Sequence, residues 1–242
     1  MQTQEHKQDG ISLKNNRTDI ITAALKSAVG IIPCVGGALS EIVSLCIPNQ
    51  RMDRVETFLK KLAMQIARLE EQQNEWMEKL KSSKGNLLLC ELAIKYSAET
   101  NSETLHHCYA YYVFNAVHNK TLEDSRSEKL LRTLSELTEE EVIHLINFSE
   151  AKGLFTSSEF DEKYEEMLMP KSRSENDEEN DIHNTFRDEY IITLEQKGLV
   201  TIVMKHSGTK FPISTNDVSI TDYGELLVKA VYDEDFFGKM AR

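Results

Sequence analysis

The feature that most constrains the fold of this sequence is a heptad pattern of apolar residues that begins just after residue 50. Members of the pattern follow one another at alternating steps of four and three positions, with one polar member; they are Val55, Leu59, Leu62, Ile66, Leu69, Gln73, Trp76 and Leu80. In an α-helix this spacing places every member on one narrow face. Such a face has to be buried against other helices, so the pattern predicts a mainly α-helical protein.

The heptad pattern predicts one long amphipathic helix over residues 49–85. Pro48 and Asn49 supply a start signal, and Gly85 supplies a stop. Two partners fit the apolar face: other helices of the same chain in a bundle, or a second copy of the chain in a coiled coil. In the second case the face is an oligomerisation seam, formed by Val55, Leu59, Leu62, Ile66, Leu69 and Trp76.

The most apolar stretch of the chain precedes this helix. Residues 20–48 contain only two charged residues in 29 positions, Lys26 and Glu41. Pro33, Gly36 and Gly37 interrupt the middle of the stretch, so the sequence predicts a helical hairpin over residues 19–48 rather than one straight helix. Each arm has about 12 residues and is roughly 18 Å long, against ~30 Å for the hydrocarbon core of a bilayer. Neither arm alone would span a membrane.

Two interpretations of the hairpin fit the sequence. It is either a membrane-active element that inserts when several copies assemble, or a buried hairpin of an ordinary helical domain. In lipid, the small residues would allow close helix contact, and Lys26 and Glu41 would face each other or a water-filled lumen. The residues assigned to the hairpin site are Ile20, Ile21, Leu25, Lys26, Val29, Gly30, Pro33, Gly36, Gly37, Leu39, Glu41, Ile42 and Val43. The stretch lacks the Lys-Ser/Thr pair of a phosphate-binding loop.

Charge is distributed unevenly along the chain. The 242 residues include 28 Lys+Arg and 40 Asp+Glu, for a net charge of -12. Residues 1–85 carry 12 basic and 10 acidic residues, and residues 86–242 carry 16 and 30, so a boundary is expected near residues 82–86. The acidic balance argues against general nucleic-acid binding. Four cysteines without a CxxC pair indicate reduced thiols and a cytoplasmic protein.

The remaining organisation follows from helical and strand patterns. Residues 1–18 are polar and predict a flexible tail, and residues 86–170 predict a helical bundle whose last helix opens with a capping box of Thr138 and Glu141. Residues 171–181 are acidic and predict a mobile loop. In residues 182–242, a helix, two strands and a helix capped by Thr221 follow one another, which predicts a winged-helix-like α+β unit.

Three functional uses of these elements have weak support in the sequence. The helix that would enter a DNA groove carries Asp188 and Glu189 beside Arg187, so phosphate would be repelled. A metal site or a nucleophilic cysteine at residues 106–108, with His118 further along, is disfavoured because adjacent helical residues point in different directions. The sequence therefore predicts no metal, no cofactor and no enzymatic activity.

Several short motifs together suggest a family. They are Ile32-Pro33-x-x-Gly36-Gly37, Ile47-Pro48-Asn49-Gln50-Arg51, the heptad helix and ITDYGELL over residues 220–227. In this combination the chain resembles bacterial antiphage-defence proteins of the abortive-infection alpha family. The resemblance implies that the protein kills or disables an infected cell, and it supplies no catalytic residues.

The resemblance and the organisation of the chain combine into one hypothesis. A cytoplasmic resting protein binds a phage-encoded trigger through its acidic C-terminal region, and a ring-shaped trigger would suit this role by concentrating copies. The copies then self-associate, and their hairpins permeabilise the inner membrane. The alternative is a soluble, non-enzymatic interaction or regulatory module with a buried hairpin. An enzyme with an active site assembled from distant residues is a third possibility.

Overall fold

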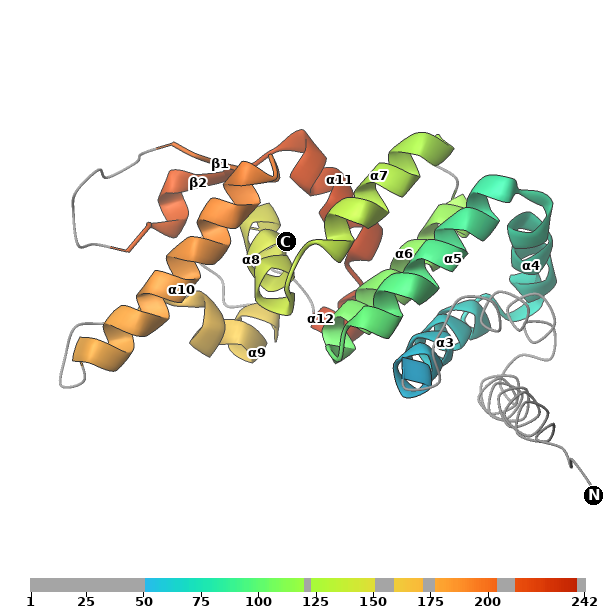
Figure 1. The fold of residues 1–242 in the computed structure, drawn as a ribbon, viewed down its shortest axis with the longest axis horizontal. Coiled ribbons are helices and arrows are strands. Elements are labelled where there is room, and N and C mark those ends of the chain that lie inside the picture. Colours follow the sequence, from blue (N-terminus) through green and yellow to red (C-terminus); the bar gives the residue numbers. More distant parts are fainter. Residues whose placement is uncertain (1–50, 120–122, 151–158, 172–176, 204–211, 239–242) are drawn as a thin grey trace, which may run out of the picture. The chain divides into compact units, whose positions relative to one another are not determined.

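The computed structural model describes residues 51–119, 123–150, 159–171, 177–203 and 212–238. Over these residues the protein is mainly helical, with a two-stranded antiparallel sheet near the C-terminus (Figure 1). The predicted tail and the apolar hairpin over residues 19–48 lie outside the described residues. Two compact units divide the chain after residue 131, later than the boundary expected near residues 82–86.

The N-terminal unit is a packed group of helices. Its elements are α3 (Met52–Ala67), the 3₁₀ helix η2 (Glu70–Gln72), α4 (Gln73–Ser82), α5 (Lys84–Glu99), α6 (Glu103–Asn119) and the first part of α7 (Asp124–Ser135). Helix α6 packs against α3, α4 and α5. Apolar side chains on the heptad face of α3 fill the centre of this unit, because α5 and α6 both pack on that helix.

The prediction of one long helix over residues 49–85 is wrong. Helix α3 begins at Met52 and ends at Ala67, and the backbone then tightens where the Leu69 N–H bonds to the Ile66 carbonyl at 3.0 Å. Glu70 follows with a φ of 47°, in the left-handed region. A straight helix from Met52 to Ser82 would be about 46 Å long, roughly twice the length of α5 or α6. The break brings the second half of the pattern back onto these two helices.

The predicted stop at Gly85 is also displaced. Helix α4 ends at Ser82, and Ser83 caps the next helix by accepting a hydrogen bond from the Asn86 N–H at 3.3 Å. The Asn86 side chain donates to the Lys79 carbonyl at 3.0 Å. Gly85 therefore lies in the first turn of α5, and two helices meet where one was expected to end.

The C-terminal unit is built around α8 (Glu139–Glu150). Its other elements are α9 (Glu159–Leu168), α10 (Asp177–Gln196), β1 (Val200–Ile202), the 3₁₀ helix η3 (Thr215–Asp217), β2 (Val218–Ile220), α11 (Asp222–Val231) and α12 (Glu234–Phe237). Helix α8 packs against α9, α10, α11 and β2. The capping box is confirmed: the Thr138 N–H donates to Glu141 at 2.8 Å, and the Glu141 N–H donates to Thr138 Oγ1 at 3.2 Å.

The two-stranded sheet agrees with the predicted strands. Strands β1 and β2 pair antiparallel, with Val200 opposite Ile220 and Ile202 opposite Val218, and all four side chains are buried. Thr221 caps α11 as expected, because its Oγ1 accepts from the Gly224 N–H at 3.0 Å. In both strands the residue between the buried pair is exposed, the alternation of a half-buried strand.

Two further expectations differ from the structure. Residues 177–181 of the predicted mobile loop form the start of α10, and helix α9 was not predicted. The predicted bundle over residues 86–170 is divided, since α5 and α6 belong to the N-terminal unit and α8 and α9 to the C-terminal one. Over the described ranges, no helix is both long enough and apolar enough to cross a membrane.

Candidate functional site

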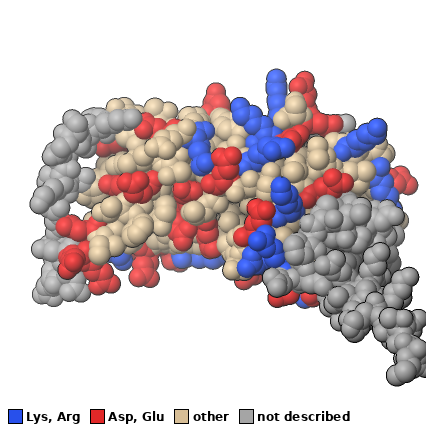
Figure 2. All heavy atoms as spheres, viewed as in Figure 1, with Lys and Arg blue, Asp and Glu red and all other residues tan. Residues whose placement is uncertain are grey.

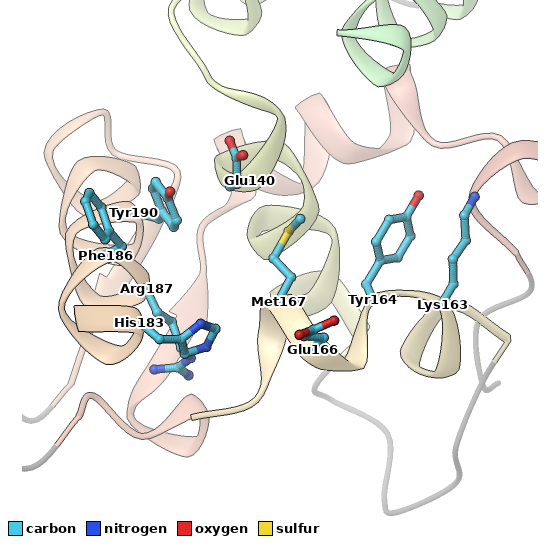
Figure 3. A pocket seen from close by; sticks show the side chains of 9 residues that line it. All are labelled: Glu140, Lys163, Tyr164, Glu166, Met167, His183, Phe186, Arg187 and Tyr190. Carbon is cyan, nitrogen blue, oxygen red and sulfur yellow. The ribbon is translucent and has the colours of Figure 1, made fainter. Parts of the chain in front are cut away.

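A cavity of about 510 Å³ lies in the C-terminal unit where α8, α9 and α10 meet (Figure 3). Helix α8 contributes Glu140. Helix α9 contributes Lys163, Tyr164, Glu166 and Met167. Helix α10 contributes His183, Phe186, Arg187 and Tyr190. The spacings within α9 and α10 are those of residues on one side of a helix, so both helices present one face to the cavity. We call this cavity the α9–α10 pocket.

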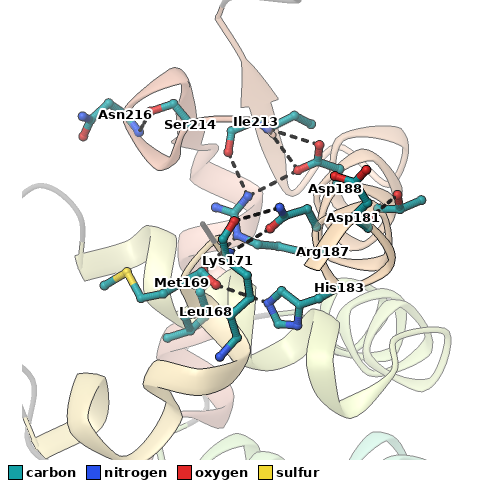
Figure 4. A network of polar contacts seen from close by, with 12 residues as sticks. Leu168, Met169, Lys171, Asp181, His183, Arg187, Asp188, Ile213, Ser214 and Asn216 are labelled. Carbon is teal, nitrogen blue, oxygen red and sulfur yellow. Dashed lines mark hydrogen bonds and ion pairs between the residues drawn. The ribbon is translucent and has the colours of Figure 1, made fainter. Parts of the chain in front are cut away.

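Arg187 lines the pocket and holds its walls together through hydrogen bonds. Its side chain is only 2% exposed, and its Nε donates to the Leu168 carbonyl at 2.9 Å (Figure 4). Its Nη1 donates to the Ile213 carbonyl at 2.8 Å and lies 3.3 Å from Asp188 Oδ1. Burial lowers the pKa of Arg187, and the Asp188 carboxylate opposes that change. The guanidinium thus joins the end of α9 and the chain before β2 to α10.

Neighbouring residues of α10 hold the same segment. The Asn184 side chain accepts from the Lys171 N–H at 2.9 Å and donates to the Lys171 carbonyl at 3.1 Å. His183 Nε2 lies 3.2 Å from the Met169 carbonyl oxygen. Burial raises the pKa of Asp188, while the Ile213 N–H at 3.0 Å opposes the rise. These contacts pin residues 168–171 to α10, so the walls of the pocket are held by hydrogen bonds as well as by packing.

His144 lies beside the pocket in the core of the unit. It is 1% exposed, and its ring packs against Tyr190 with centroids 5.8 Å apart. Neither ring nitrogen has a hydrogen-bond partner among the described residues. Burial, with smaller effects of Arg187 and His183, lowers the pKa of His144 to about 3. The imidazole is therefore neutral at physiological pH and acts here as an aromatic packing residue.

The cations of the pocket are engaged within the unit. Lys163 Nζ donates to the Phe236 carbonyl at 2.6 Å and lies 4.9 Å from the centroid of the Phe236 ring. Arg187 donates to the carbonyls of Leu168 and Ile213. No ion pair of the described residues involves Glu140 or Glu166. Burial raises the pKa of Tyr190, and the charges of Glu140 and Glu141 raise it further.

The whole net charge of the chain belongs to this unit. Residues 132–242 carry 12 Lys+Arg and 24 Asp+Glu, whereas residues 1–131 carry 16 of each. Acidic side chains gather near the N-terminal end of α10 on the face drawn in Figure 2. The unit that holds the pocket is therefore acidic, which favours cationic partners and disfavours phosphate.

An exposed apolar stripe continues from the pocket along α10. Ile182 is 53% exposed and Phe186 is 58% exposed, and Tyr190 follows at the same four-residue spacing. Met169, just after α9, is 54% exposed. Side chains of this size are more often buried, so the exposed stripe of Ile182 and Phe186 beside a cavity is typical of a binding surface.

The residues proposed as an oligomerisation seam are buried within the N-terminal unit. Val55, Leu59, Leu62 and Ile66 on α3 and Trp76 on α4 are 0–3% exposed, and Leu69 lies half-buried at the break between the helices. Trp76 Nε1 also donates to the Phe114 carbonyl at 3.1 Å. Helices of the same chain thus cover these side chains, as in the bundle alternative, and they are not presented to a second copy.

The hairpin residues, from Ile20 to Val43, lie outside the described residues. The disfavoured metal group lies on α6, where His106, His107 and Cys108 are buried in separate surroundings. His106 Nε2 is 2.9 Å from the Ser97 carbonyl oxygen, and the His107 ring stacks on Tyr111. In the described part of the chain, no group of three or more His, Cys, Asp or Glu residues is placed to hold a metal ion.

Comparison with known protein families, with characterised proteins and with solved structures finds no match for this chain. The resemblance to the abortive-infection alpha family thus stays a prediction that rests on the short motifs.

No pattern in the sequence predicted the α9–α10 pocket. One signal was present, since Phe160, Tyr164 and Leu168 recur at four-residue spacing and mark an amphipathic helix. Arg187 was counted among the surface cations of α10, and His144 carried no special pattern. Their burial depends on contacts with residues 19 to 46 positions away, such as those from Arg187 to Leu168 and from His144 to Tyr190.

Proposed function

We propose that this protein is a non-enzymatic effector of antiphage defence, in which the C-terminal unit recognises a phage-encoded protein and residues 19–48 permeabilise the membrane. The observation that carries the proposal is the apolar stretch over residues 20–48, with two charges in 29 positions. It precedes helices whose heptad face is already covered by α5 and α6. A stretch of that apolarity needs another place to be buried, and an oligomer in lipid is one.

The C-terminal unit supports the recognition half of the proposal. Its helix, strand, strand and helix order is compatible with a winged-helix-like unit, whose α10 would be the recognition helix. The one arginine of α10 is buried in a structural network, while the exposed positions include Glu178, Glu179 and Glu189. Such a helix repels phosphate, so a protein is the better partner.

The mechanism follows from these two halves. In the resting state the protein stays in the cytoplasm with its apolar stretch covered. Binding of the phage protein to the C-terminal unit shifts the population toward a state in which residues 19–48 are free. Several copies then assemble at the inner membrane, because one short hairpin is a poor span by itself.

Dye-loaded liposomes of bacterial lipid test this function. Purified full-length protein is added with and without lysate of phage-infected cells, beside a variant that lacks residues 19–48. We expect leakage only when full-length protein and infected lysate are both present. Leakage from the shortened protein, or none from folded full-length protein with infected lysate, contradicts membrane permeabilisation.

A second candidate is a soluble interaction module that never contacts lipid, and the α9–α10 pocket favours it because a binding site does not require a membrane. Gly36→Leu combined with Gly37→Leu separates the candidates. Close helix packing in lipid should not tolerate both changes. Phage protection that survives the double substitution supports the soluble module, and its loss in a folded protein supports the membrane effector.

A further inference from the structure

We propose that the α9–α10 pocket and the apolar stripe of α10 form the docking site for a basic amphipathic helix of a partner protein. Apolar side chains of that helix lie on Ile182, Phe186 and Tyr190, and its Lys or Arg side chains lie beside Glu140, Glu166 and Glu189. This inference deepens the proposed function by naming the chemistry of the recognised partner. It rests on that function only in taking the C-terminal unit as the recognition unit.

The apolar part of the surface has the dimensions of a helix-binding site. Ile182, Phe186 and Tyr190 are spaced four residues apart on α10, so the stripe extends over about 12 Å at ~1.5 Å per residue. Met167 of α9 lines the opposite side of the pocket (Figure 3). Apolar anchors of a bound helix recur at three- and four-residue steps, which match a stripe of two turns.

The stripe also extends beyond the pocket. A small molecule would be held mainly inside the cavity of about 510 Å³. Phe186, however, lines the cavity but is 58% exposed, and Ile182, one turn before it on the same stripe, is 53% exposed and does not line the cavity. A partner that covers both the cavity and Ile182 has to be longer than a pocket ligand, which a helix is.

The charged residues around the pocket indicate that the partner helix is positively charged. The exposed Lys163 and the buried Arg187 both donate to backbone carbonyls, at 2.6 Å and 2.9 Å. The carboxylates of Glu140 and Glu166 have no ion pair among the described residues, and Glu189 is exposed one turn beyond Phe186. The surface therefore offers unpaired negative charge around apolar side chains. A helix with one apolar face and flanking cations complements both features.

Synthetic peptides test the proposal on the full-length protein. The probe is a helical peptide with a Leu face and Lys on the flanking positions; one control peptide replaces Leu with Gln, and another replaces Lys with Glu. We expect the Leu/Lys peptide to bind and the two controls to bind at least about tenfold more weakly, since anchor and charge are both required. Amide exchange should show new protection in α9 and α10 of the bound wild-type protein.

Matched variants locate the site. Phe186→Ser should weaken binding of the Leu/Lys peptide by about tenfold, the scale of a lost anchor. Leu226→Ser on α11 removes an apolar side chain that is also exposed, at 43%, and should leave binding within about twofold, as surface changes away from a site do. Because Phe186 is 58% exposed, its substitution should not unfold the unit. Glu140→Gln with Glu166→Gln should weaken binding most at low salt.

The outcomes are distinct. No binding of the Leu/Lys peptide, equal binding of the Gln-containing control, protection outside α9 and α10, or an unchanged affinity of the Phe186 variant each overturns the docking site. Equal binding of the Gln-containing control would identify simple attraction of cations to an acidic protein. Peptide binding as expected in a protein that never permeabilises liposomes would leave the docking site in place and reject the membrane function.

Discussion

The Nε of Arg187 donates a hydrogen bond to the carbonyl oxygen of Leu168 across 2.9 Å, which ties the last residue of α9 to the middle of α10. This contact is buried, and the same guanidinium also bonds to the Ile213 carbonyl. The buried side chain of Arg187 thus cross-links α10 to the end of α9 and to the segment before β2. Helices α9 and α10 are two of the three helices that line the α9–α10 pocket. The shape of the proposed docking site therefore depends on this one residue.

Arg187→Ala should lower the free energy of unfolding of the C-terminal unit by ~3–5 kcal/mol, since it leaves two carbonyls without their donor and removes the cation that pairs with the Asp188 carboxylate. Lys197→Ala is the matched control in the same unit. Lys197 pairs with Glu136 at 2.8 Å, but Glu136 is 63% exposed, so its loss should cost less than ~1 kcal/mol. Amide exchange of α8 and α10 in denaturant measures both. Equal costs for the two variants would show that Arg187 is not a cross-link.

Acid should destabilise the C-terminal unit through His144. Burial lowers the pKa of the folded imidazole to about 3 from an ordinary value of 6.5. Between these values the unfolded chain binds a proton that the folded chain does not, so stability falls as the pH falls below about 6.5, by ~1.4 kcal/mol per unit once well below it. In the N-terminal unit, His106 should act on that unit in the same direction, because burial lowers its pKa too. Urea unfolding at a series of pH values from 7.5 to about 5 measures the slope.

His144→Phe should remove the contribution of His144 to that slope and raise stability at neutral pH by ~1 kcal/mol, because a buried polar ring without partners is replaced by an apolar one. A phenyl ring can keep the ring contacts with Phe148 and Tyr190. Comparison of the variant with wild type over the same pH series cancels the contribution of His106. A slope that does not change would mean that another group dominates the acid response.

Part of this architecture could be predicted from the sequence, and the successes share a physical cause. Helices α5, α6, α8 and α10 and the strands follow from local periodicity and from caps such as Thr138 and Thr221, which act within four residues. The break at Glu70 had no such signal, since Leu69 and Gln73 continue the heptad spacing across it. A straight helix would extend far beyond the ends of α5 and α6. The break is favourable because it lets α4 pack on these two helices, and such tertiary contacts are not visible in the local sequence.

The candidate site was less predictable for the same reason. Its lining residues come from α8, α9 and α10, and their meeting depends on long-range contacts. Arg187 has the same local surroundings as a surface residue, between Phe186 and Asp188 on an acidic helix. Nothing in that pattern distinguishes a guanidinium that faces solvent from one that holds two backbone carbonyls. The acidic bias of the region, in contrast, was visible from composition and already argued against a nucleic-acid partner.

Gly224→Ala should destabilise the C-terminal unit by ~1–3 kcal/mol, because an added methyl group has no room. It would collide with the Leu199 carbonyl oxygen and lie 2.8 Å from Cγ1 of Ile220. Gly85→Ala is the contrasting change. There the methyl group meets only the carboxylate of Asp124, an exposed side chain that is free to rotate away. Alanine in the first turn of α5 should be neutral or stabilising by up to ~1 kcal/mol. Thermal unfolding of both variants checks the difference.

The fluorescence of Trp76 should not depend on protein concentration. It is the single tryptophan of the chain, it is 1% exposed, and its indole donates to the Phe114 carbonyl within the N-terminal unit. If the heptad face joined two copies instead, dilution would expose the ring and shift its emission to longer wavelength. We expect a blue-shifted spectrum that is the same at every concentration.

Ile66→Ala should lower the free energy of unfolding, followed by Trp76 fluorescence, by ~2–5 kcal/mol, because the substitution leaves a cavity in the core. This loss should also be independent of protein concentration. A midpoint of unfolding that rises with concentration would return Val55, Leu59 and Ile66 to the role of an oligomerisation seam.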